Sequence, residues 1–230
     1  MERRGFIKFC AASAAALGAP ELAADARAQF YAKARLVDEK GAPLRAKAIP
    51  VNRNFIFHYP FAATPCFLLN LDKAVRPSQL RTVAGQAYEW NGGVGARRSV
   101  VAYSAICAHR LSYPTKDISF ISFRAEKSAR NRVANVIHCC SEHSQYDPAE
   151  GARVVAGPAP QPLAAILLEW DSAKDEIHAV GTLGGAMFNE FFQKFAFKLQ
   201  LEHGGAERQP VGTAARVVEL ESYCKQQVKC

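Results

Sequence analysis

Two short segments of the chain each place one cysteine close to one histidine. In the first, a single residue separates Cys107 from His109, and in the second, two residues separate Cys140 from His143. Thiolates and imidazoles are the side chains that bind zinc, copper and iron in proteins. Two loops that each offer one sulfur and one nitrogen therefore predict a metal centre with a mixed donor set.

The spacing suits a centre with two metal ions better than a centre with one. With one or two residues between the thiol and the imidazole, the two side chains of a loop can reach past each other to different ions. Structural zinc sites usually take C-x2-4-C and H-x3-5-H pairs around a single ion. A zinc module with no redox function fits this spacing poorly, but it stays open as an alternative.

The two segments and their flanks resemble the Rieske family of [2Fe-2S] proteins, over about residues 95–170. In that family two cysteines hold one iron and two histidines hold the other, and reduction potentials lie between about −150 and +300 mV. The resemblance implies that Cys107 and Cys140 bind the inner iron and that His109 and His143 bind the outer one. It also implies that the cofactor is a Rieske-type [2Fe-2S] cluster.

Residues that follow the second ligand pair match further positions of the family. Ser144 and Tyr146 match a serine and a tyrosine that donate hydrogen bonds to cluster sulfur, and such donors stabilise the reduced cluster. Gly157, Pro158 and Pro160 match the proline-rich segment that covers the cluster, where proline stiffens the chain. The alternative is a packed tyrosine, a turn serine and an ordinary connecting turn.

The chain departs from the family's pattern at three points. Quinol-oxidising members carry an additional cysteine in each ligand loop, joined as a disulfide, and those positions are Ser112 and Glu142 here. The glycine expected after the last histidine is absent. The segment between the two ligand pairs is longer than usual, and its strand-like runs, 118–123 and 133–138, predict a hairpin beside the site.

The roles of the other cysteines are less clearly indicated by the sequence. The chain has seven cysteines in all. Cys139 directly precedes Cys140 and is expected to be a buried free thiol. Cys224 and Cys230 lie close together in the tail and could form a disulfide in an oxidising compartment, although connectivity does not follow from sequence.

The N-terminus has the composition of an export signal. Arg3 and Arg4 precede a short apolar stretch, 9–19, and Ala26-Arg27-Ala28 offers an A-x-A cleavage site. We therefore expect a twin-arginine signal over residues 1–28 and a periplasmic protein. The apolar stretch is shorter than the ~20 residues of a membrane helix. Membrane contact is thus expected to be indirect, or to occur through an uncleaved N-terminal anchor.

The formal net charge of +8 favours acidic partners. A cytochrome or a larger redox subunit would supply such a surface. Nucleic acid is not expected as a partner, because the basic residues are dispersed and no nucleic-acid motif accompanies them.

Short strand-like runs separated by turn signals predict an all-β fold. The resemblance makes this an antiparallel Rieske-type sandwich or barrel, with the cluster-binding loops at its tip. Phenylalanines at three- and four-residue spacing predict a short C-terminal helix over 187–201. The expected organisation is an N-terminal arm at 29–50, a Rieske domain at 51–182, and a C-terminal helix and tail at 183–230.

The resemblance implies a periplasmic electron-transfer protein, the small subunit of a larger oxidoreductase of the arsenite-oxidase type. Such a subunit carries electrons for an oxidoreductase and is not a catalyst alone. The alternative is the Rieske subunit of a quinol-oxidising cytochrome bc-type complex, in which quinol would be a partner. An oxygenase is not expected, because the remaining histidines lack a D-x-x-x-H-type pairing for a mononuclear iron.

Overall fold

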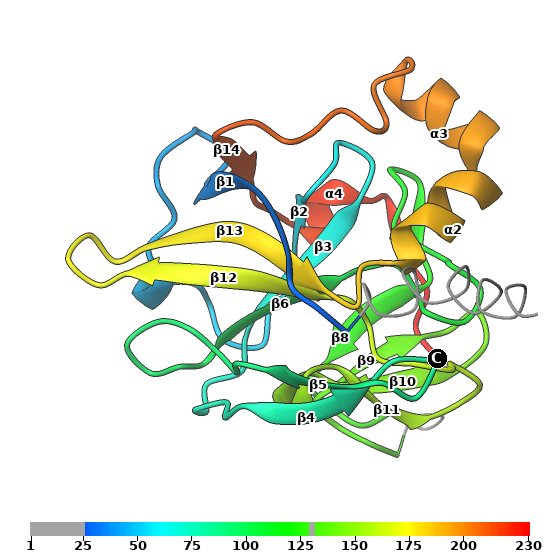
Figure 1. Ribbon diagram of the computed structural model, residues 1–230, viewed down its shortest axis with the longest axis horizontal. Helices are drawn as coiled ribbons and strands as arrows, with labels where there is room; N and C mark the ends of the chain where they lie inside the picture. The colour runs from blue at the N-terminus through cyan, green and yellow to red at the C-terminus, as the bar shows by residue number, and fades with distance from the viewer. Residues whose placement is uncertain (1–25, 129–131) are drawn as a thin grey trace, which may run out of the picture.

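The computed structural model describes residues 26–128 and 132–230, and this part of the chain is mostly β-structure. The predicted all-β fold is confirmed. The main sheet has eight strands in the spatial order β14-β1-β13-β12-β6-β3-β2-β15 (Figure 1). Their bounds are Gln29–Val37 (β1), Phe55–His58 (β2), Pro65–Asn70 (β3), Val100–Ser104 (β6), Ala165–Asp171 (β12), Glu176–Leu183 (β13), Ala214–Arg216 (β14) and Val218–Glu219 (β15).

The main sheet curves until it is nearly closed, so that β14 near one edge contacts β2 near the other. Alternate residues of a strand point to the same face. The inward-facing set forms one hydrophobic core, which includes Leu36, Phe57, Leu68, Ala102 and Ile177. The curvature therefore follows from burying one apolar face of nearly every strand against the others.

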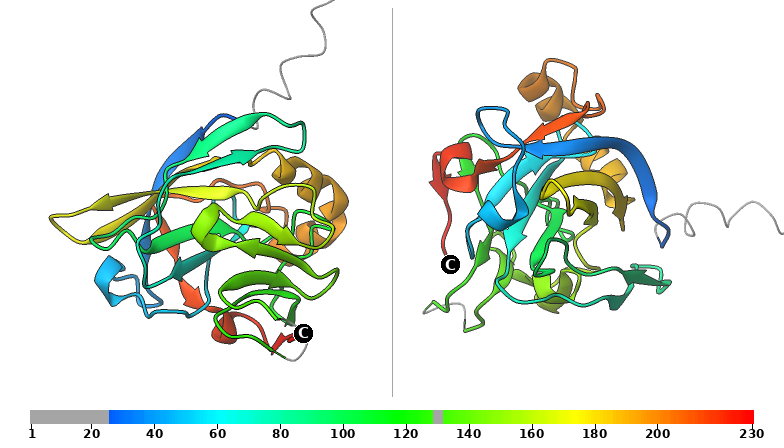
Figure 2. Two further views of the ribbon diagram at one scale, coloured as in Figure 1. Left: turned by 90° about the horizontal axis from the view of Figure 1, so that it is seen from below. Right: turned by 90° about the vertical axis from the view of Figure 1, so that its left-hand side faces the viewer.

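A second, four-stranded sheet has the order β11-β10-β9-β8 and forms a separate layer beneath the main sheet (Figures 1 and 2). Its strands are Ile121–Arg124 (β8), Val136–Cys139 (β9), Ser144–Asp147 (β10) and Arg153–Ala156 (β11). The antiparallel pairing of β8 with β9 forms the expected hairpin. The central strands β3 and β6 are buried along their whole length, because a second hydrophobic core covers their other face. This second core includes Phe67 and Val101 of the main sheet and Ile137 of the four-stranded sheet.

The remaining elements are short. Two-stranded sheets pair Ser78–Arg81 (β4) with Ala87–Trp90 (β5), and Ile118–Ser119 (β7) with Gln226–Gln227 (β16). The predicted helix is divided at Phe195 into Met187–Lys194 (α2) and Ala196–His203 (α3). The other helical segments are Ala46–Ala48 (η1), Pro148–Glu150 (η2) and Leu220–Tyr223 (α4).

Segments near both ends of the described chain contribute strands to the main sheet. Residues 29–37, expected to lie in an arm, pair with β13 as strand β1, and the tail contributes β14 and β15. The predicted export signal falls largely outside the described residues. Within the described ranges, no helix has the length and apolar character needed to cross a membrane.

Candidate metal centre

Two loops carry the predicted ligands. The first follows β6, and its tight bend is closed by two backbone hydrogen bonds: Cys107 N donates to Ser112 O, and Leu111 N donates to Cys107 O, both at 2.9 Å. The second loop, residues 140–143, connects β9 to β10, which pair so that Ser144 lies opposite Cys139. Each loop is thus fixed at both ends by a strand or by its own backbone hydrogen bonds.

A pair of buried thiols, Cys107 and Cys139, lies where the two loops meet the second core. The Cys139 thiol donates a hydrogen bond to Cys107, and this bond is the largest cause that lowers the pKa of Cys107 to about 6. The same contact, together with burial, raises the pKa of Cys139. One sulfur of this thiol pair therefore carries negative charge readily, as a metal ligand must.

The hydroxyl of Tyr146 lies at the thiol pair. It is 3.3 Å from Cys107 Sγ, and it accepts a hydrogen bond of 3.1 Å from the backbone N–H of Ala108. With that N–H as its donor, the hydroxyl can direct its own proton to the sulfur. Tyr146 is completely buried, so this arrangement is shielded from water.

The cysteines are arranged differently from what the sequence suggested. Cys140 Sγ is bonded to Cys230 in a disulfide, so this sulfur is not free to bind iron. The neighbouring Cys139, expected to be only a packed thiol, is the cysteine that meets Cys107. Cys224, the partner suggested for Cys230, is a free thiol in the structure. The sequence did hold an indication of this arrangement, which the prediction missed. In β9 apolar Ile137 alternates with polar His138, and this alternation predicts that Cys139 faces the core with Ile137.

The two predicted histidine ligands have different surroundings. His109 is half-buried, and its Nδ1 atom is buried without a hydrogen-bond partner among the described residues. His143 is exposed, has a left-handed φ of 59°, and its ring centroid lies 5.7 Å from that of His138. The backbone N–H of His109 donates to Cys107, which ties this histidine to the thiol pair.

Ser144 is the other predicted contact residue, and its hydroxyl is also buried without a partner in the described part of the chain. Ser144 lies opposite Cys139 in the β9–β10 pairing, on the same face of the sheet. Leaving a buried polar group unpaired costs about 1–3 kcal/mol. Two such atoms near one thiol pair, Ser144 Oγ and His109 Nδ1, fit a polar group bound between the loops.

The proline-rich segment packs against the second loop. Gly157 has a φ of 86°, and a Cβ atom there would lie 2.5 Å from the carbonyl oxygen of His143 and 2.6 Å from Cα of Ser144. Only glycine fits this close approach without displacing backbone. Pro158 and Pro160 follow on the exposed side. The proline-rich segment, which was expected to cover the cluster, thus lies beside the second ligand loop.

Helices α2 and α3 support the first loop. This support was not predicted from the sequence. Lys194 Nζ donates to the carbonyl of Arg110 at 2.7 Å. The ring of Tyr113 stacks edge-on against Phe191 and Phe195, with centroids 5.0 and 5.2 Å apart. The regular spacing of phenylalanines indicated a helix with an aromatic face, and this face turns out to hold the ligand loop.

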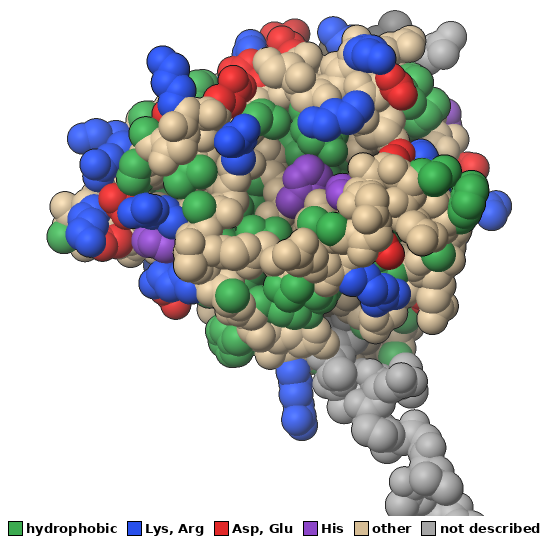
Figure 3. Space-filling view, turned by 90° about the horizontal axis from the view of Figure 1, so that it is seen from above, with side chains coloured by type: hydrophobic (Ala, Val, Ile, Leu, Met, Phe, Trp, Pro, Cys, Tyr) green, Lys and Arg blue, Asp and Glu red, His purple; other side chains and the backbone are tan. Residues whose placement is uncertain are grey.

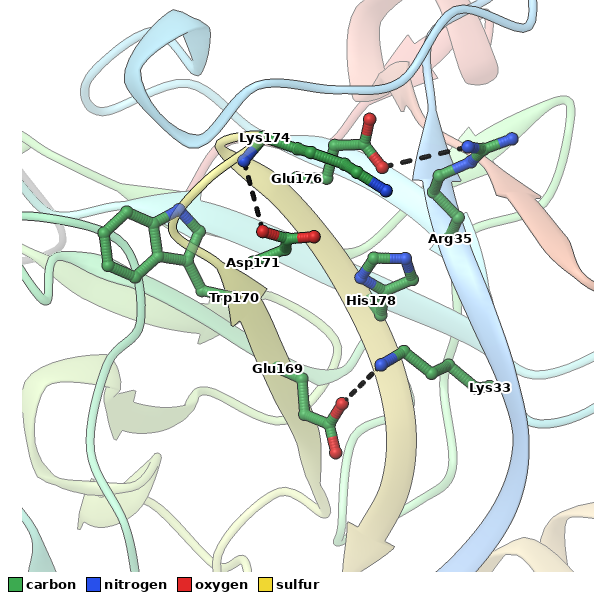
Figure 4. Close-up of a pocket in the computed structure, with 8 residues that line it drawn as sticks. All are labelled: Lys33, Arg35, Glu169, Trp170, Asp171, Lys174, Glu176 and His178. Carbon is green, nitrogen blue, oxygen red and sulfur yellow. Dashed lines mark hydrogen bonds and ion pairs between the residues drawn. The ribbon is translucent and has the colours of Figure 1, made fainter.

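A cavity of about 470 Å³ lies beside the β12–β13 hairpin (Figure 4). In Figure 1 this hairpin projects at the left, away from β9 and β10. His178 stands there between two ion pairs, Lys33–Glu169 at 2.6 Å and Arg35–Glu176 at 3.8 Å. Lysine and arginine side chains gather at this end, at the left of Figure 3. Acidic side chains of the same cavity neutralise these cations, so the cavity has no strong preference for a ligand of either charge.

No family model matches the chain. Among solved structures, the chain is similar to the soluble domain of the Rieske protein II (soxF) from Sulfolobus acidocaldarius. The two are 26% identical, and the match covers 66% of this chain and 78% of that chain, with a TM-score of 0.48.

Proposed function

We propose that the chain binds a Rieske-type [2Fe-2S] cluster and transfers single electrons. Cys107 and Cys139 would hold the inner iron, and His109 and His143 the outer one. The observation that carries the proposal is the thiol pair with the Tyr146 hydroxyl at 3.3 Å. When bound, such a cluster supplies reversible one-electron oxidation and reduction.

The protein's own residues would tune this centre. The Tyr146 hydroxyl donates toward Cys107, and the unpaired Ser144 hydroxyl can donate into the space between the loops. Donors to sulfur favour the reduced, more negative state and so raise the reduction potential. Gly157 brings the proline-rich segment against the second loop, which limits the access of water to that side.

The choice between adjacent cysteines gives a direct test. We expect Cys139→Ser to lose both iron and acid-labile sulfide, whereas Cys140→Ser should retain two iron atoms per chain. Iron and sulfide analysis of anaerobically purified protein, with low-temperature EPR of the reduced form, measures both. Loss of the cluster in Cys140→Ser but not in Cys139→Ser would overturn the ligand assignment. Zinc without iron in the unmodified protein would overturn the function.

We further propose that the protein acts in the periplasm as the small subunit of a larger oxidoreductase. Support comes from the exposed residues of the two ligand loops, Arg110, Glu142 and His143, which could meet a partner, and from the net charge of +8. Cell fractionation followed by affinity purification from the native host tests the proposal. A large redox subunit in the periplasmic eluate supports it. Copurifying b- and c-type cytochromes would instead favour a quinol-oxidising complex, and a cytoplasmic protein would contradict the proposed location.

A further inference from the structure

A second group of metal-ligating side chains lies on the other side of the second ligand loop. His138, Cys140 and Cys230, which we call the outer site, place one imidazole nitrogen and two sulfurs within 4.8 Å of one another. Both ring nitrogens of His138 are 3.6 Å from Cys230 Sγ. His138 is only 2% exposed, so its ring is held against the two sulfurs.

The outer site shares no ligand atom with the thiol pair. Successive residues of a strand point to opposite faces. His138 and Cys139 are neighbours in β9, so Cys139 faces the core while His138 faces the outside. The C-terminal tail then returns to this outer face and brings Cys230 with it. The outer site therefore includes none of the four residues proposed to bind the cluster, although His143 lies beside His138.

In the structure the two sulfurs of the outer site are bonded to each other. A dithiol reductant would transfer two electrons and two protons to this bond, leaving two protein thiols and an oxidised, disulfide form of the reductant. Loss of those two protons to water on metal binding would give two thiolates beside an imidazole. Sulfur and imidazole ligands of this kind suit Zn²⁺.

We propose that the outer site is a redox-gated site for a thiophilic divalent cation such as Zn²⁺. The site is closed while the disulfide is intact and open once the disulfide is reduced. Cys140 and Cys230 are both partly exposed, so a metal ion can enter and water can occupy the fourth position.

The fold keeps the two cysteines together after the bond between them is broken. The tail is held by the parallel pairing of β16 with β7 and by a hydrogen bond of 2.9 Å from Val228 N to Ser119 O. Arg124 Nη2 donates to the carbonyl of Val228 at 2.6 Å. Reduction therefore does not release Cys230 from His138 and Cys140.

Arg124 also favours the metal-binding form of the cysteines. Its Nη2 atom lies 4.0 Å from Cys140 Sγ. A guanidinium this close stabilises a thiolate, the form of cysteine that binds metal. Zn²⁺ itself balances the charge of both thiolates, so Arg124 acts on the cysteine sulfurs before the metal ion arrives. The surroundings thus suit two thiolates and one cation better than two neutral thiols.

Zinc binding to the full chain tests the proposal. The protein is reduced anaerobically with dithiothreitol, freed of the reductant by gel filtration, and titrated with zinc chloride, with the oxidised protein as reference. We expect the reduced protein to bind one more equivalent of zinc. We also expect zinc to slow alkylation of Cys140 and Cys230 by N-ethylmaleimide about tenfold or more, read at each cysteine by tandem mass spectrometry. This alkylation readout needs no variant.

Matched variants assign the ligands. His138→Asn and Cys230→Ser should each weaken zinc binding at least about tenfold, whereas Cys224→Ser, a change to a free cysteine of the same tail, should not. Equal zinc binding by oxidised and reduced protein would overturn the proposal, as would unchanged binding in His138→Asn. The additional equivalent should persist in Cys139→Ser, where the proposed cluster is lost, so the two proposals can fail independently.

Discussion

Replacing Tyr146 by phenylalanine tests whether the buried hydroxyl tunes an iron-sulfur centre. The substitution keeps the ring and removes one oxygen, which lies 3.3 Å from Cys107 Sγ and 3.1 Å from Ala108 N. The protein should retain the two iron atoms of the proposed cluster, because neither thiol is changed. Its reduction potential should fall, because the reduced cluster loses a hydrogen bond that stabilises its additional negative charge.

The size of the effect follows from the strength of one hydrogen bond. A bond to a charged group contributes about 1.5 kcal/mol. For a one-electron couple, about 1.4 kcal/mol corresponds to about 59 mV. Because the hydroxyl also bonds the oxidised cluster, only part of this energy distinguishes the two states. We therefore expect the potential to fall by roughly 30–60 mV.

Tyr103 provides the matched control. It too is completely buried, and its hydroxyl donates one hydrogen bond, to the carbonyl of Pro148 at 2.7 Å, away from the thiol pair. Both tyrosine-to-phenylalanine variants should lower the free energy of unfolding by about 1–2 kcal/mol. Protein-film voltammetry should show a lower potential for Tyr146→Phe alone. Equal potentials in the two variants would refute the reasoning.

Three further predictions concern single residues. Ser144→Ala should keep the proposed cluster and lower its reduction potential by tens of millivolts, because the removed hydroxyl, which is unpaired in the described structure, would donate to the cluster. Redox titration followed by EPR measures this potential. An unchanged potential would mean that the hydroxyl does not donate to the cluster. Gly157→Ala should cost about 2 kcal/mol or more in chemical denaturation, because φ is 86° and the added Cβ meets backbone at 2.5 Å. Gly41 has a similar φ of 84°, but a Cβ atom there would meet no other atom within 4 Å. Gly41→Ala should therefore lower the free energy of unfolding only by the backbone strain of about 1 kcal/mol. Equal losses of stability in the two variants would contradict the close packing at Gly157. Burial is the largest cause that lowers the pKa of His58 from 6.5 to about 4. The unfolded chain therefore takes up a proton at higher pH than the folded one, and stability that is fully present above pH 6.5 should fall by up to about 3 kcal/mol as the pH drops to about 4. Chemical denaturation between pH 6.5 and pH 4 should show a smaller loss of stability in His58→Gln than in the unmodified protein. His178 is more exposed, so His178→Gln should lose about as much stability as the unmodified protein.

Several features of the candidate site could be predicted from the sequence because they are local. The tight loop around Cys107 and the order of residues in the second loop are properties of short segments. The assignment of Ser144 and Tyr146 follows from the family resemblance, which compares the short segment after the second ligand pair. The C-x-x-H spacing favoured Cys140 as the ligand, whereas the register of β9 in the structure turns Cys139 toward Cys107. Moving a strand assignment by one residue exchanges its two faces, and this decides whether Cys139 or Cys140 meets Cys107.

Other features could not be predicted because they depend on residues far apart in the chain. The disulfide joins Cys140 to Cys230, which are 90 positions apart, and nothing near either cysteine indicates its partner. The support of the first loop by Lys194 likewise requires α2 to lie beside it. The pairing of residues 29–37 with β13 depends on distant residues in the same way, because the charged and alanine-rich composition of the predicted arm at 29–50 does not reveal a strand partner near the other end of the chain.

The parallel pairing of β1 with β14 determines when the main sheet can form relative to synthesis of the chain. Arg35 lies beside Ala214, so almost the whole polypeptide must leave the ribosome before the first strand gains this neighbour. Contacts between residues so distant in sequence slow folding, because a long loop must close before they form. The main sheet is therefore expected to assemble after synthesis, and a chain terminated before residue 214 should remain unfolded and susceptible to proteolysis.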